Sequence, residues 1–185
     1  MKKTYLFLVA CILTMGLTSC SNKAKAEIAP LAAEQTNADA DPANVRELPR
    51  NLMGSEIFKA IKANYPDQVV LIDIWATWCP PCREALKEID LIKPDLQKRG
   101  VVFVYLTGET SPLPTWKQMI PNIAGEHYRL PKAQWQNLCE SQNIPGIPAY
   151  LILNKDGSVA FSNLHEGGYP GNEIIQNYLE VALSK

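Results

Sequence analysis

The fold is decided by the stretch 69–83, which reads Val69-Val70-Leu71-Ile72-Asp73-Ile74-Trp75-Ala76-Thr77-Trp78-Cys79-Pro80-Pro81-Cys82-Arg83. Its first half is a short, β-branched and nearly uninterrupted apolar run, which predicts a fully buried strand. Beyond it, residues 84–93 carry apolar side chains at helical spacing, which predicts a helix with one apolar face. Cys79 is therefore expected where the strand ends and the helix begins, with Cys82 one turn into the helix.

Two cysteines at this junction form a redox pair. A thiolate at a helix N-terminus faces unpaired N–H groups and the positive end of the helix dipole, and both lower the pKa of the thiol. We expect Cys79 to be exposed and ionised and to attack a substrate disulfide, and Cys82 to resolve the mixed disulfide. Pro80 and Pro81 remove two N–H donors, so the Cys79 thiolate should depend on the N–H of Cys82 and on the dipole. An extremely depressed pKa of Cys79 is therefore not expected.

Asp73 interrupts the apolar strand six positions before Cys79. A charged, unpaired carboxylate is costly to bury, so the pKa of Asp73 should be raised. A catalytic carboxyl and a hydrogen-bonded polar residue at a strand end both agree with this position.

The stretch 71–82 resembles the active-site strand and loop of thioredoxin-fold proteins. Residues 75–82 are especially similar to the extracytoplasmic TlpA/ResA-like thiol-disulfide oxidoreductases. The resemblance implies an α/β thioredoxin fold, in which helices flank a central mixed sheet. It also implies a redox-active disulfide between Cys79 and Cys82, a proton-shuttle role for Asp73 toward Cys82, and no cofactor.

A second motif, Ile144-Pro145-Gly146-Ile147-Pro148, resembles the thioredoxin loop that packs beside the cysteine pair. The resemblance implies a cis Ile147–Pro148 bond, a backbone at Ile147 that binds the substrate chain, and a Pro148 that shields the sulfurs. Two ordinary trans prolines in a turn are the alternative. Trp78, Pro80 and Pro81 would join the substrate-binding surface, whereas Trp75 is expected to pack in the core.

The chain also departs from its relatives. The family often carries Glu three residues after the second cysteine, where this chain has Ala85; the neighbouring Glu84 is expected to be solvated. The usual Thr after the cis-proline is Ala149. Ordinary thioredoxins place a lysine near the buried aspartate, and residues 101–107 contain none. The tuning of the cysteine pair therefore cannot be copied from relatives.

Around these motifs, the pattern predicts strands at 101–106, 149–153 and 158–162, the last two joined by a hairpin turn. It predicts one further helix with Ser55 as its N-cap, and three others over 115–120, 133–142 and 172–183. Pro94 should bend or break the helix that follows the cysteines, and Gly100 should close it. The folded domain is expected at 46–185.

The sequence of the N-terminal region predicts a targeting segment followed by a disordered tether. Two lysines precede a 13-residue apolar run, which is too short to span a membrane comfortably, so 1–19 is predicted to be a signal peptide. The sequence Leu17-Thr18-Ser19-Cys20 resembles a bacterial lipobox, which implies lipidation of Cys20; a secretory signal with a chance cysteine is the alternative. Residues 20–45 would then form the lipidated cysteine and a disordered tether.

Charge and composition exclude several classes of function. The net charge of −1 provides no argument for nucleic-acid binding. Two histidines without ligand spacing and the lack of a second Cys-x-x-Cys predict no metal site. Cys139 is expected to be a buried small hydrophobe, with a regulatory thiol as the alternative.

The sequence thus predicts a membrane-tethered, periplasm-facing thiol-disulfide oxidoreductase, working as a monomer and as a reductant of exported proteins. Its expected partners are protein thiols and disulfides, a membrane or periplasmic redox protein, and the lipid bilayer through Cys20. The alternatives are an oxidising folding catalyst, a peroxiredoxin-like peroxidase and a non-catalytic thioredoxin-fold binding module.

Overall fold

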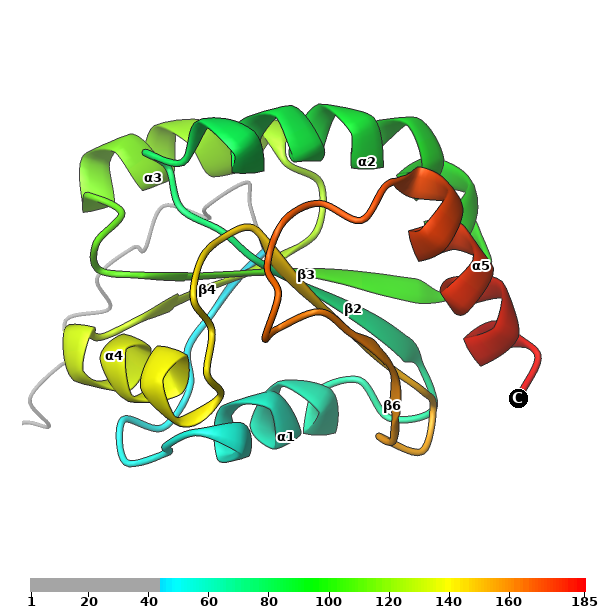
Figure 1. Cartoon of the computed structure of the whole chain (residues 1–185), viewed down its shortest axis with the longest axis horizontal. Helices are drawn as coiled ribbons and strands as arrows, with labels where there is room; N and C mark the ends of the chain where they lie inside the picture. Colours follow the sequence, from blue (N-terminus) through cyan, green and yellow to red (C-terminus); the bar gives the residue numbers. More distant parts are fainter. Residues whose placement is uncertain (1–43) are drawn as a thin grey trace, which may run out of the picture. The chain divides into compact units, whose positions relative to one another are not determined.

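The computed structural model describes residues 44–185, in which helices lie on both faces of a six-stranded sheet (Figure 1). The strands are β1 (Asn44–Arg46), β2 (Val69–Ile74), β3 (Val101–Gly108), β4 (Glu126–Leu130), β5 (Ala149–Leu153) and β6 (Val159–Ser162). The helices are α1 (Ser55–Ala63), α2 (Pro80–Lys98), α3 (Leu113–Met119), α4 (Lys132–Ser141), α5 (Asn172–Leu183) and the short 3₁₀ helix η1 (Ile120–Asn122).

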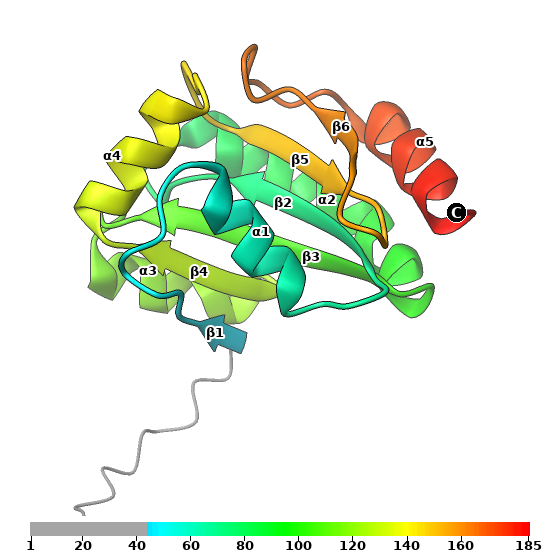
Figure 2. The ribbon, with the colours of Figure 1, turned by 90° about the horizontal axis from the view of Figure 1, so that it is seen from below.

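The sheet has the order β1-β4-β3-β2-β5-β6, which can be followed from edge to edge in Figure 2. The first four strands in this order run parallel, whereas β5 is antiparallel to β2 and β6 is antiparallel to β5. This mixed sheet confirms the predicted thioredoxin-type architecture. The carboxyl ends of β2, β3 and β4 share one edge of the sheet, where functional loops of parallel sheets gather.

Alternate side chains of β2 belong to two different hydrophobic clusters, one on each face of the sheet. Val69 and Leu71 pack with α2, α3 and α5, whereas Val70 and Ile72 pack with α1 and α4 on the opposite face (Figure 1). The same alternation directs Asp73 to the face that α2 covers.

The predicted strands in 69–75, 101–106 and 149–162, and the helix over 172–183, are confirmed with small shifts of their ends. These segments have strong local patterns, and each one packs against neighbours that the pattern favours.

Two strands, β4 and the short β1, were not predicted. β4 carries the charged residues Glu126 and Arg129 and has no run of apolar residues, so its place between β3 and β1 depends on pairing with distant strands. Its partner β1 contains Asn44 and Val45, which the sequence analysis assigns to the tether. In the structure the ladder with β4 orders the backbone at these two residues.

Two helix ends also differ from the prediction. α2 does not break near Lys93 but continues through Pro94 to Lys98, and the turn beyond the proline buries Leu96 in the core. Core packing thus offsets the backbone hydrogen bond that proline cannot make. The N-cap of α1 is Gly54 rather than Ser55, since Gly54 has φ of 50° and its N–H donates to Asn137 Oδ1 at 2.9 Å.

The predicted signal peptide, the lipidated Cys20 and the rest of the tether lie outside the described residues. Within 44–185, none of the helices has the length and hydrophobicity needed to cross a membrane.

Candidate functional site

The cysteine pair lies at the junction of β2 and α2, as predicted. Cys79 is the N-cap of α2, and a disulfide joins it to Cys82 across a Cα–Cα distance of 5.3 Å. Pro80 and Pro81 open the helix, where a missing N–H costs little. The N–H of Cys82 points to Cys79 Sγ at 3.2 Å, so it is the donor that a Cys79 thiolate would use.

The sulfurs are less accessible than the sequence suggests. In this disulfide-bonded form Cys79 is only 2% exposed and Cys82 only 1%, and the exposed Cys79 expected of the reduced, attacking form stays a prediction. The reason is tertiary: Cys79 packs in the core cluster on the α2 face, and its Sγ lies 3.6 Å from the carbonyl oxygen of Ile147. By contrast, Trp78 is 56% exposed and both prolines are exposed, so these three side chains form the accessible surface beside the disulfide.

The loop before the cysteines is held by a buried hydroxyl pair that sequence reasoning missed. The N–H of Thr77 donates to Ser111 Oγ at 3.1 Å, and Ser111 Oγ lies 2.8 Å from Thr107 Oγ1. All three residues are buried. Because Ser111 follows β3 and Thr107 belongs to it, only the pairing of β3 with β2 brings them to this loop.

The proline loop lies against the disulfide. The Ile147–Pro148 bond is cis, as the family resemblance predicts, and Pro148 is buried. A distant segment braces this loop: Gly168 N–H donates to the Pro148 carbonyl at 2.7 Å, and Asn163 Nδ2 donates to the Gly168 carbonyl at 2.8 Å. Hydrogen bonds from residues 163–168 therefore hold the proline loop, whose Ile147 carbonyl lies beside Cys79.

Asp73 is fully buried on the α2 face, directly opposite Tyr105 of β3 and Tyr150 of β5. Within residues 44–185 neither of its carboxyl oxygens accepts a hydrogen bond of ordinary geometry. Burial raises the pKa of Asp73 to about 8, although the charge of Lys93 and the Tyr150 hydroxyl both act to lower it. The predicted raised pKa is thus confirmed, and the reading of Asp73 as a satisfied polar residue is not supported.

A lysine does accompany this aspartate, but it comes from helix α2. Lys93 is buried, and its Nζ lies 3.0 Å from the Tyr105 hydroxyl. Lys93 therefore lies outside 101–107, the segment in which the sequence lacks the lysine of ordinary thioredoxins. The available signal was its position, four residues after Ile89 and three before Leu96, on the apolar stripe of the helix.

The other singled-out residues occupy ordinary positions. Trp75 is buried and Glu84 is exposed, both as predicted. Ala85 is also buried, and Glu84 forms an ion pair with Lys87. Cys139 is half-buried and not disulfide-bonded, and burial raises the pKa of its thiol, which makes it a poor nucleophile. Within the described residues, no three His, Cys, Asp or Glu side chains cluster closely enough to hold a metal ion.

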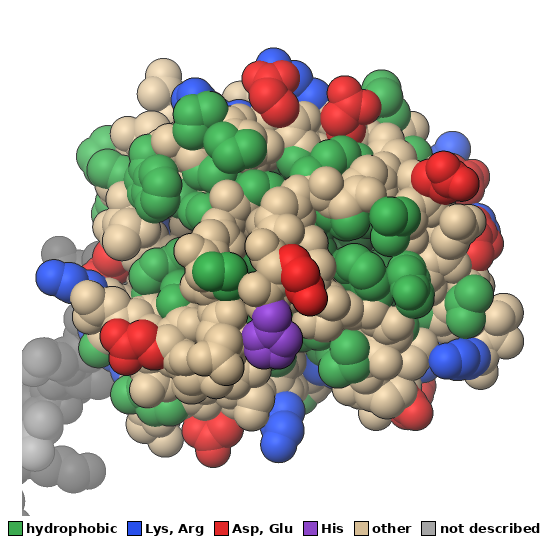
Figure 3. Space-filling model, in the orientation of Figure 1, with side chains coloured by type: hydrophobic (Ala, Val, Ile, Leu, Met, Phe, Trp, Pro, Cys, Tyr) green, Lys and Arg blue, Asp and Glu red, His purple; other side chains and the backbone are tan. Residues whose placement is uncertain are grey.

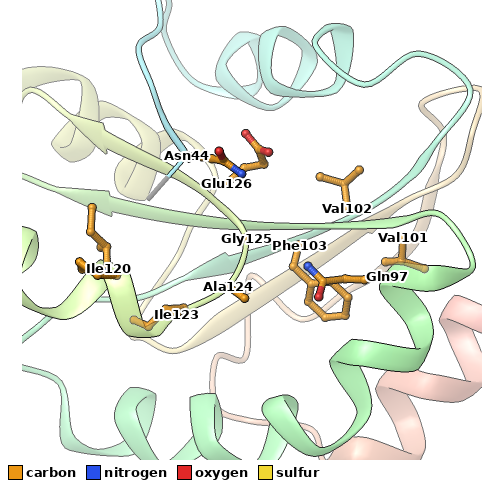
Figure 4. Close-up of a pocket in the computed structure, with 11 residues that line it drawn as sticks. Asn44, Gln97, Val101, Val102, Phe103, Ile120, Ile123, Ala124, Gly125 and Glu126 are labelled. Atoms are coloured by element: carbon orange, nitrogen blue, oxygen red, sulfur yellow. The ribbon is translucent and has the colours of Figure 1, made fainter. Parts of the chain in front are cut away.

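One pocket, of about 460 Å³, lies away from the cysteines (Figure 4). It is lined by the beginnings of β3 and β4, including Val101, Phe103 and Gly125, at the edge of the sheet opposite the disulfide. It contains neither cysteine, so the candidate site is the surface around the disulfide and not this pocket.

Comparisons with known proteins agree with this geometry. Residues 67–159 match the family model described as thioredoxin-like. The thiol-disulfide oxidoreductase ResA of Halalkalibacterium halodurans is 19% identical over 112 residues, which are 60% of this chain and 61% of that protein. ResA of Bacillus thuringiensis is 22% identical over 111 residues, with the same coverage. The aligned region thus spans less than two thirds of the length of these relatives.

Solved structures share the fold. A thioredoxin-family thiol:disulfide interchange protein from Chlorobium tepidum has a TM-score of 0.54 at 22% identity and covers 66% of this chain and 84% of its own. A thiol-disulfide isomerase from Corynebacterium glutamicum has a TM-score of 0.57 at 14% identity, with coverages of 66% and 85%. Since the family match spans half of the chain and contains both cysteines, Asp73 and the cis-proline, the chain belongs to the thioredoxin-like family.

Proposed function

We propose that this protein is a thiol-disulfide oxidoreductase that acts on other proteins through Cys79 and Cys82. The observation that carries the proposal is the disulfide at the N-terminus of α2, with Cys79 Sγ 3.6 Å from the backbone carbonyl of Ile147. A sulfur at a helix N-terminus and a backbone beside it supply both the nucleophile and a docking point for a substrate strand. The ResA relatives carry the same activity in their names.

The bonds that form and break in the exchange involve only the two cysteines and the substrate. In the reduced form the Cys79 thiolate attacks one sulfur of a substrate disulfide, and the other substrate sulfur leaves as a thiolate. Cys82 then attacks Cys79, so the Cys79–Cys82 bond forms and the bond between Cys79 and the substrate breaks. The substrate gains two electrons as a dithiol, and the protein becomes the disulfide seen here.

Asp73 would handle the proton of Cys82. Cys82 must lose its proton before it attacks, and it is buried on the same face as Asp73. A carboxyl with a pKa of about 8 exists in both protonation states near neutral pH, so it can accept that proton and later return it.

The substrate surface would include Trp78, Pro80, Pro81, Ile147 and Pro148. Hydrophobic side chains gather over α3 and the N-terminal end of α2 in Figure 3, and Leu113 at the start of α3 is among the exposed ones. Such a surface suits an extended polypeptide that carries apolar residues around its disulfide.

Reduction of insulin tests the activity. The wild-type protein, supplied with dithiothreitol, should accelerate insulin reduction, whereas Cys79→Ser should fall to the rate of dithiothreitol alone. Cys139→Ser is the matched control, because it removes a half-buried thiol that we place outside the site. Equal rates for wild type and Cys79→Ser would leave only a non-catalytic binding module.

We further propose that the protein acts as a reductant. The pair should then have a reduction potential near that of thioredoxin, about −270 mV. Equilibration with glutathione or dithiothreitol buffers, followed by quantification of the two thiols, measures the potential. A value near about −120 mV, typical of strong disulfide donors, would make the protein an oxidising folding catalyst instead.

The proposed location is the periplasm-facing side of a bacterial membrane. Residues 1–19 would be the signal peptide, Cys20 would carry the lipid, residues 20–45 would form the tether, and the domain would be monomeric. The support is the lipobox-like sequence Leu17-Thr18-Ser19-Cys20. The redox partner would then be a membrane or periplasmic thiol protein. Cys20→Ala should move the full chain out of the membrane fraction; retention there would contradict the lipid anchor.

A further inference from the structure

Lys93 occupies a position where a lysine is unexpected. It lies on the apolar stripe of α2 with Leu86, Ile89 and Leu96, and it is only 3% exposed. Lysine is almost never fully buried unless paired, and it normally extends its ammonium group to water. Leucine or methionine would fill this place without the cost of burying a charge.

The ammonium group is held between a buried and a surface group. Its Nζ lies 3.0 Å from the Tyr105 hydroxyl and 5.3 Å from the centre of the Tyr105 ring. It also forms an ion pair with Asp90, one turn earlier on α2, whose side chain is 48% exposed. Lys93 therefore has one partner in the sheet and one at the surface.

Tyr105 contacts Lys93 and lies beside Asp73 in the sheet. The two residues are direct neighbours across β3 and β2, so their side chains lie on the same face. Asp73 itself is fully buried, without a hydrogen bond of ordinary geometry to either oxygen within the described chain. The row Asp73, Tyr105, Lys93 and Asp90 thus runs from the middle of the sheet to solvent.

We propose that Lys93 is a positioning residue for the reaction proposed above: its ammonium group, held by Tyr105 and Asp90, sets the charge that the buried Asp73 carboxyl can carry when Cys82 gives up its proton. The role of Lys93 in disulfide exchange rests on the proposed function, whereas its effect on the protonation of Asp73 does not. Lys93 of α2 and the Tyr150 hydroxyl of β5 both act on Asp73, and the charge of Asp73 in turn reaches the hydroxyls of Tyr105 of β3 and Tyr169 before α5. Lys93 is the cation among these groups.

A purely structural role is the competing explanation. Pro94 has no N–H for the carbonyl of Asp90, and the Asp90–Lys93 pair joins side chains across that turn. Such a role predicts that removing either partner changes stability alone. A role toward Asp73 predicts that the two removals shift its titration in opposite directions.

The test is a titration of the Asp73 carboxyl carbon by NMR in full-length protein with ¹³C-labelled aspartate, assigned by its absence in Asp73→Asn. Lys93→Met removes a positive charge, so the midpoint should rise by about one pH unit or more. Asp90→Asn leaves Lys93 uncompensated, so the midpoint should fall. Lys87→Met, the same change at an exposed, Glu84-paired position of α2, should leave it in place.

The same variants should shift the midpoint of the pH–rate profile for mixed-disulfide resolution in the same directions, because Cys82 is proposed to give its proton to Asp73. An Asp73 midpoint that stays in place in folded Lys93→Met, or that moves the same way in Asp90→Asn, would overturn the proposal. Asp90 is a surface residue, so its variant stays informative even if Lys93→Met does not fold. The titration needs no enzymatic activity, so its outcome is independent of the insulin assay.

Discussion

Cys82→Ser is expected to convert the protein into a trap that stays covalently bound to its substrates. With Cys79 intact, the first attack still forms the mixed disulfide, but no thiol follows three residues later to release it. The serine hydroxyl cannot take over this step at neutral pH, because it is a far weaker nucleophile than a thiolate. The steady-state amount of adduct should therefore rise at least about tenfold over wild type.

The adducts can be measured in the host cell after acid quenching and alkylation, by comparing reducing and non-reducing gels and identifying partners by mass spectrometry. Cys79→Ser/Cys82→Ser is the matched control, because it keeps every other cysteine of the full chain, including the half-buried Cys139. The double variant should lose the adducts. If they persisted, another cysteine would be the nucleophile, and the assignment of Cys79 would be wrong.

Asp73→Asn is expected to stabilise the oxidised protein, increasingly so as the pH rises. The pKa of this carboxyl is raised from its ordinary value of 3.8 to about 8 by burial, so between these values the folded state holds a proton that the unfolded state has lost. Stability therefore declines as the pH rises through this window, since the unfolded state binds fewer protons. The variant lacks this loss and should be more stable by roughly 2–5 kcal/mol at pH 8.

Urea unfolding of both proteins at pH 4.5, 6, 7.5 and 9 measures this difference. The gap should be small at pH 4.5, widen up to about pH 8 and then level off. Asp95→Asn, at an exposed position of α2, should show no such trend. A gap that did not change with pH would mean that Asp73 titrates normally in the folded protein.

The same substitution should slow exchange, because the Cys82 proton loses its acceptor. The rate of mixed-disulfide resolution across pH 6–9 separates the two effects. If Asp73→Asn were more stable but had an unchanged rate profile, the cost of burying a charged Asp73 would be supported and its proton-shuttle role would be excluded. Stability gained and activity lost together would mark Asp73 as a group kept for function at a cost to the fold.

Much of the site was accessible from the sequence because its signals are local. A β-branched run predicted β2, the spacing of two cysteines and two prolines predicted the start of α2, and the resemblance at 144–148 predicted the cis bond. One polar residue in an apolar strand was enough to predict a raised pKa for Asp73, because burial dominates that pKa. None of these inferences required knowledge of which strands pair.

What remained hidden depends on contacts between distant segments. β4 lacks an apolar run and is ordered by pairing with β3 and β1, and α2 continues past Pro94 because the core accepts Leu96. The sequence by itself determined the redox pair, the buried acid and the proline loop, through spacing and hydrophobic pattern. Only the tertiary structure decided that Cys79 is covered in the oxidised form and that Lys93 reaches Tyr105 beside Asp73, because burial and charge are properties of the packed neighbourhood.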